Sequence, residues 1–194
     1  LAMLGDAGVS ASIIDVDAFA LHNVFEHNYP DAMDGVVALV NVGNETTNVN
    51  FMEDGVPLLV RDIPFGTRHL REVLQRERGM SSDEADAMVE GRGDSTDLRE
   101  FVADRVDELA LGIERAAAFV TAQAGTLNLG RLFLSGGGAR VPGLVDALGT
   151  RLSVRTEMAN PLQRVAVRPE VMQEIDIDEL APMLMLPVGL ALRK

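Results

Sequence analysis

A short polar turn carries groups that can bind phosphate. Gly43 would let backbone amides approach a ligand closely, and the adjacent hydroxyls of Thr46 and Thr47 could donate hydrogen bonds to phosphate oxygens. Asn41 and Asn44 place side-chain amides on the two sides of Gly43. A plain hairpin between two strands would have the same pattern, and it is the commoner explanation of such a turn when the turn is considered alone.

A run of three glycines forms a second candidate site. Gly136, Gly137 and Gly138, followed by Ala139, leave bare backbone against which a planar or phosphate-bearing group could lie. The dipole of the helix expected after them would add attraction for anions. The run lacks the Lys-Ser/Thr ending of a P-loop and the spacing of a dinucleotide fingerprint. A close strand-to-helix turn without a ligand is the structural alternative.

Two other groups of residues are expected to be structural. Pro64 presets a turn after Asp62, and Phe65 would fill the core, which we prefer to ligand contact at this segment. Asp15 and Asp17 would share one face of a strand, but a helix cap explains them better.

The composition argues against several classes of protein. The 194 residues include 17 basic and 30 acidic side chains, a net charge of −13, whereas nucleic-acid binders cluster Lys and Arg on one face. The acidic residues between 83 and 114 are expected to form a solvated helix face. There is no cysteine, which excludes disulfides and thiolate sites and fits a reducing compartment. His22, His27 and His69 are too few and too scattered to indicate a metal centre.

The sequence predicts a soluble chain. No basic segment followed by an apolar stretch begins at Leu1, so no secretory signal is visible. The longest apolar stretch, residues 180–192, contains two prolines and is shorter than the roughly 20 residues that span a bilayer. Because the chain starts without Met, we expect a fragment of a longer protein.

Hydrophobic patterns predict five strands. Residues 36–40 form a continuous aliphatic run typical of a strand buried on both faces of a mixed sheet. Residues 46–52 alternate like a half-buried strand, and an Asp-Gly turn should return the chain along residues 56–60. Two further strands are expected at residues 131–135 and 154–158.

Helices are predicted near both ends of the chain. A strand end at residues 13–16 should lead into a helix whose apolar face includes Phe19 and Phe25. The apolar residues 177–192 predict a final helix interrupted by its prolines, with Met183 in the core.

More helices are predicted between the strands. Gly79 should stop the helix that follows the hairpin, and Ser81 with Glu84 fits a capping box for the next helix. A long amphipathic helix should reach residue 125, and another should start near Pro142. The alternation of strands and helices predicts an α/β or mixed α+β fold.

Seven segments, in this order, resemble the PilM family of type IV pilus assembly proteins. That family lies in the actin-like ATPase group that also holds the cell-division protein FtsA. The glycine run alone would match many actin-like proteins, whereas RDIPFG directly after the hairpin is more specific. The segments are IDVDAFAL (14–21), ALVNVG (38–43), TTNVN (46–50), RDIPFG (61–66), LFLSGGGARVPGL (132–144), NP (160–161) and PVGLAL (187–192).

The resemblance implies an α/β, actin-like ATPase (ribonuclease H-like) fold with a mixed sheet flanked by helices. Residues 1–34 would be the end of an N-terminal lobe and the connecting helix. Residues 35–194 would be the second, nucleotide-binding lobe, with 67–125 as a helical subdomain. ATP and Mg2+ would lie between the two lobes. The second phosphate loop would lie at Asn41, Gly43, Asn44, Thr46 and Thr47, and the adenosine loop at Gly136, Gly137, Gly138 and Ala139. Residues 15–21 would match the helix that connects the lobes.

The resemblance also implies a partner and a location. Members of the family lie at the cytoplasmic face of the inner membrane, bind the cytoplasmic tail of PilN and help to assemble the pilus alignment complex. A cytoplasmic ATP-binding scaffold is therefore expected, held at the membrane by protein partners without inserting itself. An actin-like cell-division protein or a small-molecule kinase of the same superfold remains the alternative. The first would usually end in a basic amphipathic helix, and the second needs a positioned catalytic carboxylate.

Asn41 departs from the pattern of actin-like ATPases, in which the strand before the second phosphate loop commonly ends in Asp. A neutral amide can neither act as a carboxylate base nor attract Mg2+ as a carboxylate does. We therefore expect at most a weak ATPase. This part alone, with one wall of the site, should bind ATP poorly and be inactive.

Overall fold

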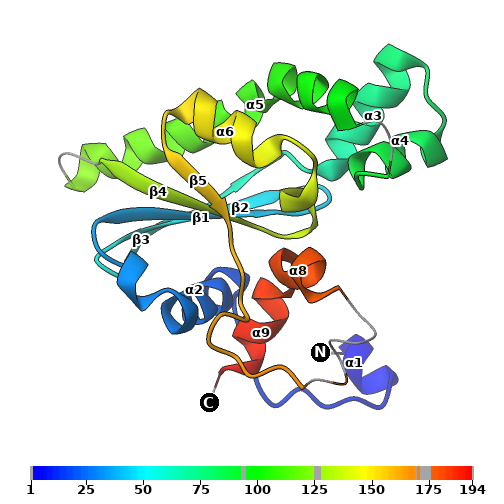
Figure 1. The fold of residues 1–194 in the computed structure, drawn as a ribbon. Coiled ribbons are helices and arrows are strands. Elements are labelled where there is room, and N and C mark those ends of the chain that lie inside the picture. The colour runs from blue at the N-terminus through cyan, green and yellow to red at the C-terminus, as the bar shows by residue number, and fades with distance from the viewer. Residues whose placement is uncertain (1, 93–94, 125–127, 169, 171–175, 194) are drawn as a thin grey trace.

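A five-stranded mixed sheet forms the centre of the molecule (Figure 1). The computed structural model describes residues 2–92, 95–124, 128–168, 170 and 176–193. The strand order is β3-β2-β1-β4-β5, with β1 antiparallel to β2, β2 antiparallel to β3, and β1, β4 and β5 mutually parallel. The strands are β1 (Val36–Val42), β2 (Thr47–Glu53), β3 (Val56–Ile63), β4 (Leu129–Ser135) and β5 (Arg155–Met158).

Helices cover both faces of the sheet (Figure 1). Helices α5 (Ser95–Ala124) and α6 (Leu144–Leu152) lie on one face, and α2 (Asp17–Asn28) and α9 (Met185–Ala191) lie on the other. Helices α3 (Thr67–Arg78) and α4 (Ser82–Val89) lie beyond one end of the sheet. The short elements are α1 (Ala2–Asp6), η1 (Pro30–Ala32), η2 (Gly137–Arg140), α8 (Ile177–Leu180) and η3 (Ala181–Leu184).

Each face of the sheet has its own apolar core. Side chains alternate along β1, so Ala38 and Val40 pack toward α5 and α6, whereas Val37 and Leu39 pack toward α2 and α9. β1 is therefore buried on both faces, as its continuous aliphatic run predicts. The predicted α/β fold with a mixed sheet is confirmed.

Several local predictions are also confirmed. Asp54 and Gly55 have φ values of 48° and 78°, as a tight turn between β2 and β3 requires. Ser81 and Glu84 form the predicted capping box at the start of α4. Gly79, in the left-handed conformation, ends α3.

The N-terminal predictions need correction. Residues 13–16 form no strand, and α2 begins at Asp17. Phe19 is 48% exposed and so does not belong to the core face of α2, whereas Phe25 is fully buried. The helix-cap explanation also fails, because no side chain caps α2 and Asp15 forms an ion pair with Arg193 at 2.8 Å.

Other boundaries differ from prediction as well. The final helix is divided into α8, η3 and α9, and Met183 is 43% exposed because it lies in the 3-10 segment between the helices. β1 extends through Asn41 to Val42, and β3 extends to Ile63. β2 is more deeply buried than its alternation predicts, because Asn50 faces α2, where its Nδ2 donates to the carbonyl of Ala18 at 3.3 Å.

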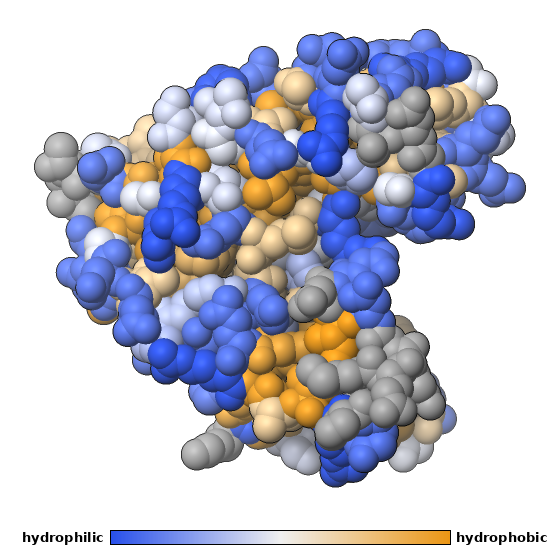
Figure 2. Space-filling model, viewed as in Figure 1, coloured by the Kyte–Doolittle hydropathy of each residue, from blue (hydrophilic) through white to orange (hydrophobic). Residues whose placement is uncertain are grey.

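Apolar surface gathers on the lower body of the molecule, where α8 and α9 lie (Figure 2). Leu190 of α9 and the N-terminal residues Ile13, Ile14 and Val16 are all exposed. Within the described ranges, none of the helices is both long enough and apolar enough to cross a bilayer.

Candidate functional site

The sheet places the two candidate loops next to each other. β1 and β4 are adjacent and parallel, so the chain leaves both strands at the same edge, with Asn41 beside Ser135. The Ser135 hydroxyl donates to Asn41 Oδ1 at 3.2 Å. Two segments almost a hundred residues apart in sequence therefore meet at one edge of the sheet.

Backbone contacts fix the turn after β1. The amide of Gly43 donates to the carbonyl of Thr46 at 3.1 Å, and a Cβ at Gly43 would lie only 2.8 Å from that oxygen. Two amides from the first turn of α3, those of Thr67 and Arg68, donate to the carbonyls of Gly43 and Asn44. The sequence-based choice of Gly43 for a close backbone approach therefore has a structural basis.

The two threonines of the turn face different surroundings. Thr47 is fully buried, and its hydroxyl donates to the carbonyl of Phe65 at 2.8 Å. Thr46 is exposed. Thr46 is consequently free to meet a ligand, whereas Thr47 supports the turn.

The three glycines of the second loop also differ. Gly136 has a φ of +82°, and a Cβ there would lie 2.4 Å from the carbonyl oxygen of Val42. A Cβ at Gly138 would lie 2.2 Å from Val42 Cγ1. Both glycines are required for the loop to pass the end of β1. For these two positions the structure supports the alternative given above, a close strand-to-helix turn. Gly137 is exposed, and a Cβ there would meet nothing within 4 Å, so only Gly137 borders open space.

Other contacts hold this second loop in place. The amide of Gly136 donates to the carbonyl of Pro182 at 2.8 Å, and Ala139 is buried. Arg140 pairs with Glu179 of α8. Contacts with η3 and α8 therefore hold this loop in place.

A cavity of about 450 Å3 lies where β1, β2, β3 and α2 meet. Asn41 and Thr46 line it together with Asp17, Asn48 and Asp62. Sequence reasoning did not place the last three in a site, because the start of α2 and the β2-β3 register bring them together. Asn48 and Asp62 are polar residues of β2 and β3, but these strands contain other polar residues too, so residue type alone did not mark them.

The cavity suits an anionic ligand that carries its own cation. None of its lining side chains is basic, and two, Asp17 and Asp62, are carboxylates. Asn48 Nδ2 donates to Asp62 Oδ1 at 2.8 Å, while Asn48 Oδ1 is buried without a partner among the described residues. Carboxylate and amide oxygens are ligands that Mg2+ prefers. A Mg2+-bound phosphate group therefore fits these residues better than a free phosphate does.

The arginines nearest the turn are already paired. Arg68 contacts Glu72 and Glu45, and these hydrogen bonds raise the pKa of its guanidinium. Arg71 contacts Asp86 at 2.6 Å and donates to Asn44 Oδ1 at 2.7 Å. Neither arginine is free to neutralise a phosphate, which again favours a divalent cation.

The fold is that of the actin-like proteins. The structure aligns with MreB5 of Spiroplasma citri bound to AMPPNP at a TM-score of 0.62 and 11% identity, over 96% of this chain and 60% of that one. It also aligns with the ethanolamine utilization protein EutJ from Carboxydothermus hydrogenoformans at 0.68 and 20% identity, over 97% and 57% of the two chains.

The family assignment is more specific than the class. The family described as type IV pilus assembly protein PilM matches residues 1–194, so the chain belongs to the PilM family. It is also similar to the protein in a solved PilM-PilN type IV pilus biogenesis complex, with a TM-score of 0.82 and 25% identity over 98% of this chain. The chain spans about half the length of these solved relatives, 55% in the case of that complex.

Proposed function

We propose that this chain forms the nucleotide-binding lobe of a type IV pilus assembly scaffold that binds Mg2+-ATP and the cytoplasmic tail of PilN. The observation that carries the proposal is that a chain of the PilM family brings its Gly43 turn and its glycine loop to one edge of the sheet, beside a cavity with two carboxylates. The full site and the partner-binding surface would include parts of the family protein that lie outside these residues.

Different described residues would contact the phosphates and the Mg2+ of the nucleotide. The turn at Gly43, Asn44 and Thr46 would hold the phosphates through amides and one exposed hydroxyl. Asp17 and Asp62 would face the Mg2+, whose charge offsets that of the phosphates. Thr47 would keep the turn in shape through its bond to Phe65.

The glycine loop would form the adenosine side of the site. Gly137 would let the adenosine lie against bare backbone, because it borders open space. Gly136, Gly138 and Ala139 would set the course of the loop past β1. The lobe division at residues 34 and 35 and the helical subdomain at 67–125 remain part of the proposal.

A scaffold fits this site better than a strong ATPase. Asn41 has a neutral amide whose oxygen already accepts a hydrogen bond from Ser135, so it cannot take a proton from an attacking water. The protein would act at the cytoplasmic side of the inner membrane, held there by PilN. No feature of the described residues favours the alternatives, a cell-division protein or a small-molecule kinase.

The Gly137→Asp variant tests the nucleotide site. The added carboxylate would enter open space without a clash and would repel phosphate or block adenosine. In the full reading frame that contains this chain, we expect the affinity for a fluorescent ATP analogue with Mg2+ to fall about tenfold or more, with an unchanged thermal unfolding midpoint. Gly5→Asp, also in open space but in α1, adds the same charge as a control and should have no effect. Unchanged affinity in Gly137→Asp would refute the adenosine-loop assignment.

A further inference from the structure

Two arginines without ion pairs lie on either side of one groove. Most described arginines contact a carboxylate, as expected in a chain with a net charge of −13. Arg61 of β3 and Arg115 of α5 contact none among the residues that the structure describes, and both are exposed. Arg131 and Arg168 also lack an ion pair among the described residues, but only Arg61 and Arg115 share a groove.

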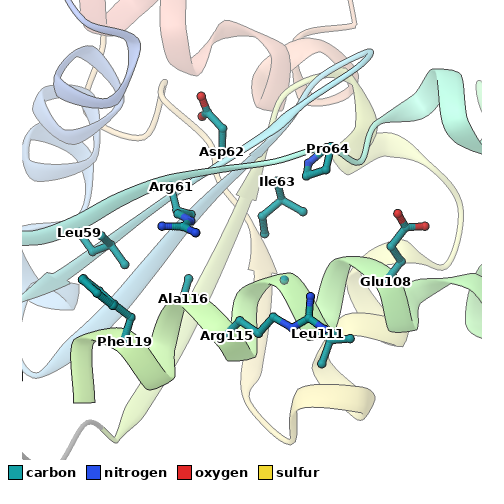
Figure 3. Close-up of a pocket in the computed structure, with 11 residues that line it drawn as sticks. Leu59, Arg61, Asp62, Ile63, Pro64, Glu108, Leu111, Arg115, Ala116 and Phe119 are labelled. Atoms are coloured by element: carbon teal, nitrogen blue, oxygen red, sulfur yellow. The ribbon is translucent and has the colours of Figure 1, made fainter. Parts of the chain in front are cut away.

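The groove lies between strand β3 and helix α5 (Figure 3). It has a volume of about 350 Å3. Helix and strand touch at its floor, where a Cβ at Gly112 would lie 2.8 Å from Ile63 Cδ1. Leu59 and Phe119 form an apolar end, and the two arginines lie farther along (Figure 3). The groove therefore offers apolar contact followed by positive charge.

The two carboxylates that line the groove form no ion pair with these arginines. Glu108 Oε2 lies 3.2 Å from His69 Nε2. Asp62 accepts a hydrogen bond from Asn48, and its side chain points away from α5 toward the opposite side of the sheet (Figure 3). The guanidinium groups of Arg61 and Arg115 are therefore available to a ligand.

The wall of the groove is an edge strand. β3 is the outermost strand of the described sheet, with β2 on one side and no strand from the described residues on the other. Val60 is 40% exposed on it, and Leu59, Arg61 and Ile63 share its α5-facing side. The free side of such a strand presents backbone groups that an extended peptide can pair with.

We propose that β3 and α5 form a docking site for an extended acidic segment of a partner protein, which adds to the sheet as a sixth strand. Residues on one face of a strand are about 6.6–6.8 Å apart at alternate positions. The partner would therefore place an apolar side chain near Leu59 and Phe119 and, two residues away, an Asp or Glu near Arg61 and Arg115. The groove and the cavity proposed for nucleotide lie on opposite faces of the sheet, and Asp62 lines both.

A second copy of this chain fits the groove less well. If two β3 strands paired, the Arg61 side chain of each copy would face the α5-facing side of the other β3. That side carries no carboxylate with which Arg61 could pair. The charge of the groove therefore favours a different, acidic partner.

Peptide binding to the full reading frame that contains this chain tests the proposal. Fluorescein-labelled ten-residue peptides would alternate Val with Asp, Ser or Lys, and their affinities would be measured by fluorescence anisotropy. We expect the Asp peptide to bind about tenfold tighter than the Ser peptide, and the Lys peptide to bind most weakly. The double variant Arg61→Glu and Arg115→Glu should reverse the order of the Asp and Lys peptides. An equal affinity for all three peptides would overturn the proposal.

A control and a second probe complete the test. Arg168→Glu changes another exposed arginine that has no ion pair among the described residues and lies outside the groove, so it should leave the order unchanged. Asp peptides N-methylated at alternate amides would then test strand addition. Methylation along one edge should abolish binding, and methylation along the other should not. Equal effects of the two peptides would overturn strand pairing, and loss of self-association in the double variant would assign the groove to a second copy instead.

Discussion

At the residue scale, neighbouring residues of the same type serve different purposes. Thr46 and Thr47 both appear in the sequence as donors to phosphate, yet strand alternation turns Thr47 into the core, where it donates to Phe65, and leaves Thr46 exposed. Gly136 and Gly138 are needed for close packing, whereas Gly137 is open. Residue type alone could not separate these roles, because they depend on which neighbour lies within a few ångströms.

The two threonines give a matched pair of variants. Thr47→Val removes a buried hydroxyl and leaves the Phe65 carbonyl without its donor, so the free energy of unfolding should fall by about 1–2 kcal/mol. Thr46→Val should leave that free energy within about 0.5 kcal/mol of the parent but weaken Mg2+-ATP binding. Urea denaturation and nucleotide titration measure the two effects. Equal stability of the variants would contradict the division of roles.

At the element scale, the packing of α9 against α2 depends on Gly189. A Cβ at Gly189 would lie 2.0 Å from the carbonyl oxygen of Ala20, so Gly189→Ala should separate the helices and lower the free energy of unfolding by about 2–3 kcal/mol. Gly5→Ala, in α1, meets nothing within 4 Å and serves as the control. If both variants unfold at the same urea concentration, the α2-α9 contact does not hold this face of the sheet.

Helix α2 also introduces a dependence on pH. Burial lowers the pKa of His22 from its ordinary value of 6.5, with Glu26 opposing the shift, and His22 Nδ1 lies 3.0 Å from Met52 Sδ. Below pH 6.5 the unfolded chain binds this proton more readily than the folded chain does. The free energy of unfolding should therefore fall as the pH drops from 6.5 through the lowered pKa.

Two histidine variants isolate this effect. His22→Asn should show a shallower loss of stability between pH 7.5 and pH 5 than the parent chain, as measured by urea denaturation. His27→Asn, at an exposed position of the same helix, should keep the parent slope. The same slope in His22→Asn would rule out burial of His22 as a cause.

The strands and most helices were predictable from the sequence, but the tertiary contacts between them were not. The aliphatic run of β1, the Asp-Gly turn and the capping box are local signals, and the structure follows them. The exposure of Phe19 and the break between α8 and α9 depend on tertiary packing. In the same way both glycine loops were found from sequence, whereas Asp17, Asn48 and Asp62 became part of a site only through the docking of α2 and the register of β2 and β3.

At the scale of the whole molecule, the two faces of the sheet carry different candidate sites. The cavity proposed to bind nucleotide lies on the α2 face of the sheet, and the arginine groove lies on the α5 face. Ile13, Ile14 and Val16 are exposed, and Val16 lines the cavity. A second wall for the cavity is consistent with solved relatives that are nearly twice the length of this chain.

Calorimetry on the full reading frame tests the central claim most directly. The protein would be titrated with the N-terminal cytoplasmic tail peptide of its PilN partner, with and without Mg2+-ATP. We predict tail binding whose affinity changes with nucleotide, which gives the coupling free energy between the two sites. Gly137→Asp should still bind the tail but lose the response to nucleotide. Firm Mg2+-ATP binding without any tail binding would contradict the scaffold account and favour a small-molecule kinase.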